Sequence, residues 1–374
     1  MTLTMMSLEG SVEETIYYIK NKDAVLGSFR WRTPELAELV EDNGLPKFVT
    51  GDMDGWLSSR TPPKHREHIM DLLQSLELSD TKSIIDFSKG LSLNDTLWVT
   101  PQPDVQWHTV SLFENTFNDV IARTAFEGGL RGMGFSTTSP EFGTDGMLAK
   151  CWVRGEDGVI RLYKSGSSGA SNAGKEPYSE ILAHQVLDCL GYNHIPYRLA
   201  RYHGKLVSIC DLFTNERVAY KPIYQWHSFS GLKDLLSKCK QASMDKALAR
   251  MLIFDYLVWN TDRHAGNFGV LLDADTFELQ GMAPIFDNGC ALLTYWNGRE
   301  PIDKYTSRAI PAMYNSFEYG AQLGKIVLGN EHNVEKLIGF KFDASAVPGF
   351  SDECLNAIES WLQSRVQTFL AMNV

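Results

Sequence analysis

The hydrophobic and polar positions at the start of the chain predict two strands followed by a short helix. Residues 12–20 and 25–31 have the mixture of β-branched, aromatic and polar residues that is typical of strands. The helix is expected next, because Thr33 can cap it and Pro34 suits its first position. Asn43 and Gly44 are residues that commonly end a helix.

A second helix is expected over residues 63–78, where four apolar residues recur on one face: Ile69, Leu72, Leu73 and Leu76. His65 and His68 lie three residues apart on the same predicted helix and could meet a metal ion. A solvated helix face is the favoured interpretation, since no third ligand is in view.

The pattern beyond residue 131 begins with a predicted hairpin. Residues 147–153 and 159–164 are rich in strand-forming residues, and the intervening Asp157–Gly158 pair is a typical hairpin turn. A Gly- and Ser-rich loop follows over residues 165–174, and a helix is expected from about residue 177 to residue 190.

Further along, a second hairpin gives way to helices. Residues 197–202 and 205–210 are the expected strands of that hairpin. Beyond about Gly231 the pattern is mainly helical, apart from two short strands expected over residues 268–272 and 277–282. A β-rich piece followed by a helical piece indicates two lobes with a cleft between them.

Composition and charge support a globular protein with two modules. The 374 residues are 44% hydrophobic and 22% charged, which is typical of a packed core. The net charge is −11, of which −9 falls within residues 1–130. Residues 1–130 therefore form an expected acidic module, and residues 131–374 a nearly neutral one, with a Gly-rich boundary at residues 128–134. The acid excess argues against direct nucleic-acid binding.

Targeting signals and cysteine usage favour a cytoplasmic protein. No apolar run is long enough to span a bilayer, and residues 1–10 lack the pattern of a signal peptide. The six cysteines are scattered without close pairs, unlike a disulfide framework or a zinc site built from cysteines. We expect them to be reduced thiols.

The clearest chemistry lies in the segment between the predicted helix near residue 260 and the following strand. Asp262 and Asn267 are five residues apart, and Asp287 follows the next pair of strands in a D-x-G sequence. Phosphoryl transfer requires a carboxylate that accepts a hydroxyl proton, together with amide and carboxylate oxygens that hold Mg²⁺. The order D-x₄-N followed by D-x-G is the one that protein-kinase-like enzymes use.

Upstream residues complete this set. Lys164 ends the second strand of the first hairpin, where kinases place a lysine that contacts nucleotide phosphates, and Glu180 lies early in the next helix and can pair with it. Residues 144–146 can form a phosphate-covering turn through backbone N–H groups. The chain has no P-loop sequence, and its close glycines at residues 128–134 do not follow a convincing strand, so P-loop and Rossmann sites are disfavoured.

These motifs resemble those of the HipA-like kinases, a bacterial serine/threonine kinase family with a divergent protein-kinase fold. The resemblance covers roughly residues 135–340 and is carried by FDYLVWNTDRHAGNF at residues 254–268 and APIFDNG at residues 283–289. It extends to TDGMLAKCW, LYKSG and EPYSEILA at residues 144–152, 162–166 and 176–183.

The resemblance implies a role for each matching residue. Asp262 would be the catalytic base, and Asn267 and Asp287 would be the Mg²⁺ ligands. The implied nucleotide-binding residues are those that surround the phosphates and the base: Gly146, Lys150, Lys164, Glu180, Cys210, Leu212 and His264. Of these, Gly146 and Lys150 would belong to the phosphate loop, and the strand end at Cys210–Leu212 would face the adenine.

The predicted fold is therefore α+β. A two-lobed protein-kinase-like domain, with an N-lobe at about 135–212 and a C-lobe at about 213–374, follows an α+β module of unknown role. The expected function is phosphoryl transfer that depends on ATP and Mg²⁺, to a Ser or Thr hydroxyl of a protein, with autophosphorylation within residues 136–144 in keeping with the family. An antitoxin-like protein is the partner that the resemblance implies, and no membrane partner is expected. A small-molecule kinase and a non-catalytic nucleotide-binding regulator are the alternatives.

Overall fold

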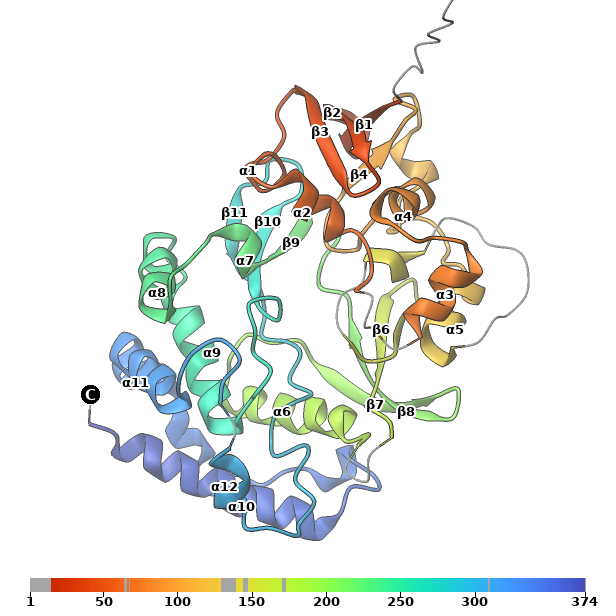
Figure 1. Cartoon of the computed structure of the whole chain (residues 1–374). Coiled ribbons are helices and arrows are strands. Elements are labelled where there is room, and N and C mark those ends of the chain that lie inside the picture. Colours follow the sequence, from red (N-terminus) through yellow and green to blue (C-terminus); the bar gives the residue numbers. More distant parts are fainter. Residues whose placement is uncertain are drawn as a thin grey trace, which may run out of the picture.

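The computed structural model describes residues 15–63, 66, 68–128, 139–143, 147–169, 173–308 and 310–373. Within these ranges the chain forms three antiparallel sheets, with helices gathered toward the C-terminal end (Figure 1). The first sheet and the long helix α12 (Asp352–Ala371) lie at opposite ends of the molecule (Figure 1). No helix in these ranges is both long enough and apolar enough to cross a membrane.

The first sheet has the strand order β3-β2-β1-β4. Its strands are β1 (Ile16–Asn21), β2 (Ala24–Thr33), β3 (Leu36–Asp42) and β4 (Leu97–Thr100). The two predicted strands are confirmed as β1 and β2, but the helix predicted to start at Thr33 is wrong, because residues 36–42 pair with β2. The Thr33 hydroxyl does accept backbone N–H groups, from Glu35 and Leu36, but it does so in the turn between two strands.

Helices make up most of the rest of the front part of the chain, and some of them pack on this sheet. They are α1 (Lys47–Thr50), α2 (Met53–Ser58), α3 (Ile69–Ser75), α4 (Thr81–Ser88) and α5 (Asp119–Glu127). The helix predicted over residues 63–78 is confirmed only as the shorter α3. The residue before it, His68, has a left-handed backbone conformation, and the helix starts after this residue. Its apolar face is confirmed, since Ile69, Leu72 and Leu73 are buried against α4 and α5. His65 lies outside the described residues.

The second sheet has the order β5-β6-β8-β7 and is built from the two predicted hairpins. Its strands are β5 (Lys150–Arg154), β6 (Ile160–Ser165), β7 (Tyr197–Tyr202) and β8 (Lys205–Asp211). Helix α6 (Glu176–Leu190) runs between the hairpins in sequence and begins with Pro177 in its first turn, as predicted. It packs against β6, β7 and β8 with its buried face.

The third sheet and the remaining helices form the C-terminal part. The sheet has the order β11-β10-β9, with β9 (Val218–Pro222), β10 (Gly269–Asp273) and β11 (Leu279–Met282). The helices are α7 (Ile223–Trp226), α8 (Leu232–Gln241), α9 (Asp245–Val258), α10 (Ile302–Thr306), α11 (Phe317–Leu328) and α12. Helix α9 is buried on nearly every side, and the largest apolar cluster surrounds it.

A buried ion-pair network joins the front segment to the third sheet. Asp95 receives two hydrogen bonds from the Arg60 guanidinium, at 2.7 and 2.8 Å, and one from Lys221 Nζ at 2.7 Å. All three side chains are buried. Next to it, the backbone N–H of Tyr220 donates to the carbonyl of Asn94 at 2.7 Å. The segment before β4 is thereby fixed to β9.

Candidate active site

Lys164 lies near the end of β6 and meets two carboxylates. Its Nζ is 3.2 Å from Oε1 of Glu180 on α6, and it also forms an ion pair with Asp287. The lysine and the glutamate are buried, whereas about a quarter of the Asp287 side chain is exposed. A strand, a helix and a later loop therefore bring these three residues together.

Glu180 holds two segments at once. While Oε1 accepts from Lys164, Oε2 accepts from the backbone N–H of Asn288 at 2.7 Å. The hydroxyl of the neighbouring Ser179 donates to the carbonyls of Asn288 and Ala291, both at 2.8 Å. The N-terminal half of α6 thus fixes the loop that carries Asp287 against the strand that carries Lys164.

The backbone at Asp287 has an uncommon conformation. Its φ of 57° lies in the left-handed region, which a non-glycine residue adopts only where surrounding contacts hold it. Those contacts include the bond from its N–H to the hydroxyl oxygen of Tyr197, at 3.2 Å, and the Glu180 bond to the next residue. The conformation aims the carboxylate at Lys164.

Charge pairing dominates the electrostatics here. Burial by itself would raise the pKa of the Asp287 carboxyl, but the positive charges of Lys164 and Lys150 outweigh it and hold the pKa at about 2. Burial likewise opposes the charged form of Lys164, and the negative charges of Asp287 and Glu180 overcome it, so that the pKa of Lys164 rises. Both groups are therefore charged at neutral pH.

The loop between α9 and β10 presents Asp262. The backbone N–H of Asp262 donates to Oδ1 of Asn260 at 3.2 Å, and its carbonyl accepts from Nδ2 of Asn267 at 2.9 Å. These bonds fix the backbone of the loop and leave the Asp262 side chain exposed. Although the residue is open to solvent on one side, the protein atoms around its carboxyl partly desolvate it, and this desolvation and the negative charge of Asp287 raise the pKa of Asp262.

Arg263 is the main residue here to which the sequence assigned no role. Its guanidinium is fully buried and donates to both carboxylate oxygens of Asp255 on α9, at 3.1 to 3.2 Å. It also donates to the carbonyl of Asn267 at 2.9 Å and to Oδ1 of Asn288 at 2.6 Å. Arg263 therefore connects the Asp262 loop to the Asp287 loop. The available signal was an arginine beside Asp262 in the polar loop, eight residues after Asp255 in the otherwise apolar last turns of α9.

The other predicted site residues differ in how closely they approach this group. Lys150 is buried on β5, opposite Lys164 in the strand register, and its charge acts on Asp287. His264 is exposed, and its Nδ1 accepts from the backbone N–H of Gly266 at 3.0 Å. Gly146 lies outside the described residues.

The strand end that was expected to face adenine is β8 and the residue after it. Cys210 is buried, and burial, followed by the nearby charge of Glu180, raises the pKa of its thiol to about 12. The backbone N–H of Leu212 donates to the carbonyl of Ile160 at 2.9 Å, and its side chain packs on the apolar cluster around Trp98. Cys210 thus lies near the Lys164–Glu180 pair, whereas the Leu212 side chain contacts the Trp98 cluster.

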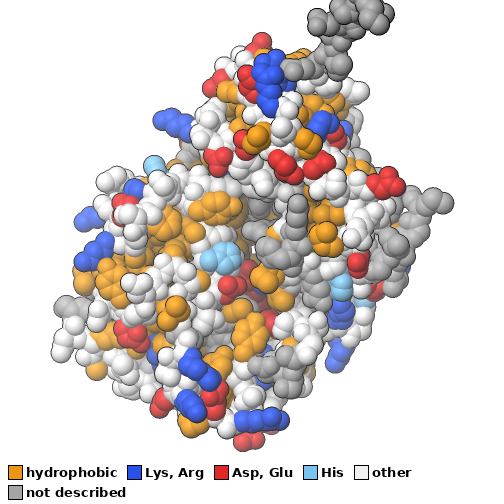
Figure 2. Space-filling model, viewed as in Figure 1, with side chains coloured by type: hydrophobic (Ala, Val, Ile, Leu, Met, Phe, Trp, Pro, Cys, Tyr) orange, Lys and Arg blue, Asp and Glu red, His pale blue; other side chains and the backbone are white. Residues whose placement is uncertain are grey.

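The donor set fits a hard divalent cation. Because Nδ2 of Asn267 donates to a carbonyl, the amide is oriented and its Oδ1 is left to accept. Asp287 adds a carboxylate that stays ionised at neutral pH. Amide and carboxylate oxygens are the ligands that Mg²⁺ prefers. Figure 2 shows acidic side chains within a recess near the middle of the face, beside a histidine.

The chain has partial sequence similarity to a known kinase. No protein-family model matches the chain. The chain is 28% identical over 137 residues to the serine/threonine-protein kinase CtkA of Helicobacter pylori, a match that covers 31% of this chain and 40% of CtkA. The chain therefore spans less than half the length of that relative. The crystal structure of CtkA, a proinflammatory kinase, aligns with a TM-score of 0.44 at 18% identity, over 59% of this chain and 89% of CtkA.

A second solved structure resembles nearly the whole chain. HipA from Shewanella oneidensis MR-1, in a toxin–antitoxin complex with HipB and operator DNA, aligns with a TM-score of 0.58 at 11% identity. The alignment covers 95% of this chain and 98% of the HipA chain, so it includes residues of the front segment. The predicted α+β kinase-like fold and the predicted resemblance to HipA-like kinases are confirmed.

Proposed function

We propose that this protein is a kinase that uses ATP and Mg²⁺ to phosphorylate a Ser or Thr hydroxyl of another protein. The observation that carries the proposal is the convergence of Lys164, Glu180 and Asp287 beside the Asp262–Asn267 loop. A fold shared with HipA and a partial sequence match to a serine/threonine-protein kinase support it.

In the proposed reaction Asp262 is the catalytic base. The acceptor hydroxyl oxygen forms a bond to the γ-phosphorus as the bond from that phosphorus to the bridging oxygen of ADP breaks. The hydroxyl proton passes to the Asp262 carboxylate, which is exposed and therefore open to an acceptor. Its raised pKa makes it a better proton acceptor than an ordinary aspartate.

Lys164 places a buried positive charge where the phosphates of ATP would lie. Because Glu180 holds Nζ from the α6 side, the lysine is oriented before the nucleotide binds. Asn267 and Asp287 would hold Mg²⁺ through Oδ1 and the carboxylate, and the ion would neutralise charge on the phosphate oxygens. Arg263 donates to the backbone carbonyls of Asn267 and of Phe286, the residue before Asp287, and so fixes the backbone at both ligands.

The test is an intact-mass measurement after incubation with MgATP, together with transfer of labelled phosphate to added protein acceptors. The wild-type chain is expected to gain phosphate, and Asp262→Asn and Asp287→Ala are expected to abolish the gain. Asp275→Asn, at an exposed residue paired with Lys22, is the matched control and should behave as wild type. Full transfer by Asp262→Asn would refute the proposal. Mapping the phosphate by mass spectrometry tests the autophosphorylation segment, of which only residues 139–143 are described.

A protein partner and a cellular location belong to the same proposal. HipA of Shewanella oneidensis assembles with HipB, and we extend to this chain an antitoxin-like protein as its partner. A cytoplasmic location suits a reaction that consumes ATP. It also suits the six cysteines, which are all free thiols. Co-expression with the product of the adjacent gene, followed by size-exclusion chromatography, tests the partner.

A further inference from the structure

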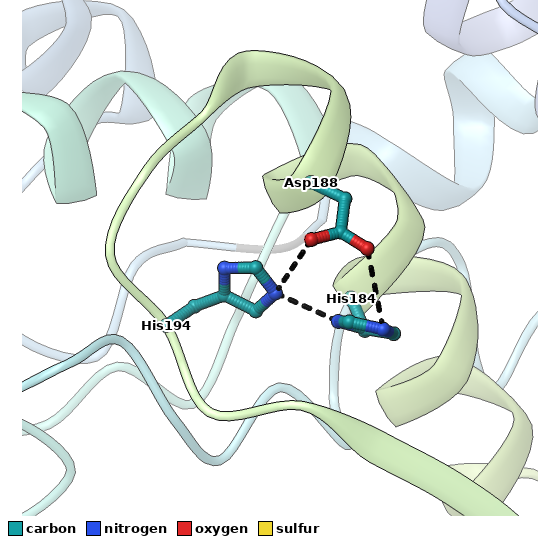
Figure 3. Close-up of side chains that lie close together, drawn as sticks. All are labelled: His184, Asp188 and His194. Carbon is teal, nitrogen blue, oxygen red and sulfur yellow. Dashed lines mark hydrogen bonds and ion pairs between the residues drawn. The ribbon is translucent and has the colours of Figure 1, made fainter.

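Two histidines and an aspartate lie together at the C-terminal end of α6, on the part of that helix that the proposed phosphoryl transfer does not use. His184 and Asp188 are one helical turn apart on α6, so their side chains share a face. His194 lies in the connection between α6 and β7, and its ring points back at the other two (Figure 3). We name this group the His–Asp–His cluster.

The three side chains of the cluster lie within contact distance of one another. Nδ1 of His184 is 2.7 Å from Nε2 of His194. The Asp188 carboxylate lies 3.5 Å from Nε2 of His194 and 3.4 Å from Nε2 of His184. Within the described residues, this is the group of His, Cys, Asp and Glu side chains whose ligand atoms all lie within 4.8 Å of one another.

A backbone contact orients His194 as metal-binding histidines are oriented. Its Nδ1 lies 2.7 Å from the carbonyl oxygen of Tyr192, and since a carbonyl only accepts, Nδ1 carries the hydrogen. In the neutral imidazole the lone pair is then on Nε2, the atom that faces His184 and Asp188. A second ring nitrogen bonded to a backbone carbonyl is the usual support of a metal-ligating histidine.

Burial leaves one side of the cluster open. The His194 side chain is 8% exposed and that of His184 is 20% exposed, whereas the Asp188 side chain is 63% exposed. An ion can therefore enter from solvent beside Asp188 and keep water as a further ligand. Three-ligand zinc sites have such a donor set, with two imidazole nitrogens and a carboxylate oxygen. They also leave one coordination position open.

We propose that His184, Asp188 and His194 bind a divalent transition-metal ion of the zinc type. Ligands 2.0–2.1 Å from a tetrahedral zinc ion are about 3.3 Å apart. The oxygen of Asp188 is already near that spacing from His194, and the two ring nitrogens need to separate by about 0.6 Å. To bind the ion through Nδ1, His184 would turn its ring and carry its hydrogen on Nε2 instead.

An ion at the His–Asp–His cluster would connect two parts of the candidate active site. His194 pairs with Ile285, two residues before Asp287, and the N–H of Ile285 donates to the carbonyl of Asn193 at 3.0 Å. On the other side, His184 is one turn beyond Glu180 on α6. The metal would therefore attach α6 to the segment that leads into Asp287, as a structural brace.

The test is titration of chelator-treated full-length protein with Zn²⁺, by calorimetry and by elemental analysis after dialysis. We expect about one ion per chain, a higher melting temperature with Zn²⁺, and visible ligand-field absorption when Co²⁺ replaces it. Asp188→Asn and His194→Ala should each weaken binding by at least about 100-fold, more than the loss of a supporting residue costs. His227→Ala, at an exposed histidine outside the cluster, should bind as wild type.

Two outcomes would overturn the proposal. Absence of Zn²⁺ binding by the wild-type chain would show that the cluster is a hydrogen-bonded group alone. Unchanged Zn²⁺ affinity in Asp188→Asn would place any bound ion elsewhere. Asp188 is exposed, so this variant is expected to fold, and neither measurement depends on kinase activity.

Discussion

Arg263 and Asp255 form a fully buried ion pair in which the guanidinium donates to both carboxylate oxygens. Asp255 lies in the last turns of α9, and Arg263 lies in the loop that presents Asp262. Since α9 is buried on nearly every side, the pair anchors the loop to a helix within the largest apolar cluster. The same guanidinium then reaches the carbonyl of Asn267 and the side chain of Asn288.

Replacement of Arg263 by Ala should strongly destabilise the protein. It leaves the Asp255 carboxylate buried without its cation, which costs about 3–5 kcal/mol. Urea unfolding monitored by circular dichroism measures the change. Arg198→Ala, at a half-exposed arginine, should change stability by less than about 0.5 kcal/mol. A loss below about 1 kcal/mol for Arg263→Ala would contradict this account of the pair.

Lys164 and Glu180 should affect phosphoryl transfer to different extents. Lys164→Ala removes the charge that we propose to contact the phosphates, and we expect kcat/KM for ATP to fall by at least about 100-fold. Glu180→Gln keeps the lysine but loosens its orientation, and a fall of about 10-fold is expected. Steady-state kinetics with labelled ATP measure both. Lys246→Ala, at an exposed residue, is the control, and equal activity of Lys164→Ala and Lys246→Ala would contradict the assignment.

The rate of phosphoryl transfer should fall at acidic pH, and at a higher pH than for an ordinary aspartate. Asp262 acts as a base only when ionised, and its pKa is raised, so protonation on acidification begins above the usual range of about 3.9. The measurement is kcat/KM from about pH 4 to pH 8 at constant ionic strength. A rate that is independent of pH down to about pH 4 would show that Asp262 is not the base.

Because of Asp95, the free energy of unfolding should decrease at acidic pH. Burial would raise the pKa of this carboxyl, but Arg60 and Lys221 lower it to about 2 in the folded protein. Its stabilising contribution, about 2.5 kcal/mol, is present above the unfolded-state pKa of about 3.9 and is lost as the pH falls toward 2. Asp95→Asn should lower stability by about 3–5 kcal/mol at pH 7 because two cations stay buried without their anion.

The comparison for Asp95→Asn is urea unfolding at pH 7 and at about pH 3, where wild type loses part of this contribution and the variant does not. Lys221 remains a charged partner at pH 7, since burial lowers its pKa only to about 8. Asp275→Asn, at an exposed aspartate, serves as control. If the stability of the wild type and that of Asp95→Asn changed equally with pH, Asp95 would not be the source of the pH dependence.

Local patterns predicted the second sheet and α6 well, because their signals are complete within short segments. Asp157–Gly158 defines one turn, and Pro177 marks the first turn of the helix. The helix predicted after Thr33 failed because capping residues also suit turns, and pairing with β2 decided between them. Strand β9 was not predicted, since its sheet partner β10 is some 50 residues away in sequence.

The sequence predicted which residue types the candidate site contains, but not how they are supported. Lys164 and Glu180 could be paired from their places on a strand and a helix, and the structure brings them to 3.2 Å. The hydrogen bonds of Arg263 join α9, the Asp262 loop and the Asp287 loop, which spacing alone does not place. The His–Asp–His cluster was missed for a similar reason, because only the i, i+4 relation of His184 and Asp188 is visible in the sequence.

The network around Asp95 has a consequence for how the protein can be handled. A fragment that starts at residue 131 would keep Lys221 on β9 but lose Asp95. The Lys221 ammonium would then lack its negative partner, which would destabilise the fragment. Tyr220 would lose the acceptor of its backbone N–H in the same cut. Because β9 pairs with β10, which directly follows the Asp262 loop, the damage would spread toward the catalytic segment, and expression of the full chain is the sound basis for any assay.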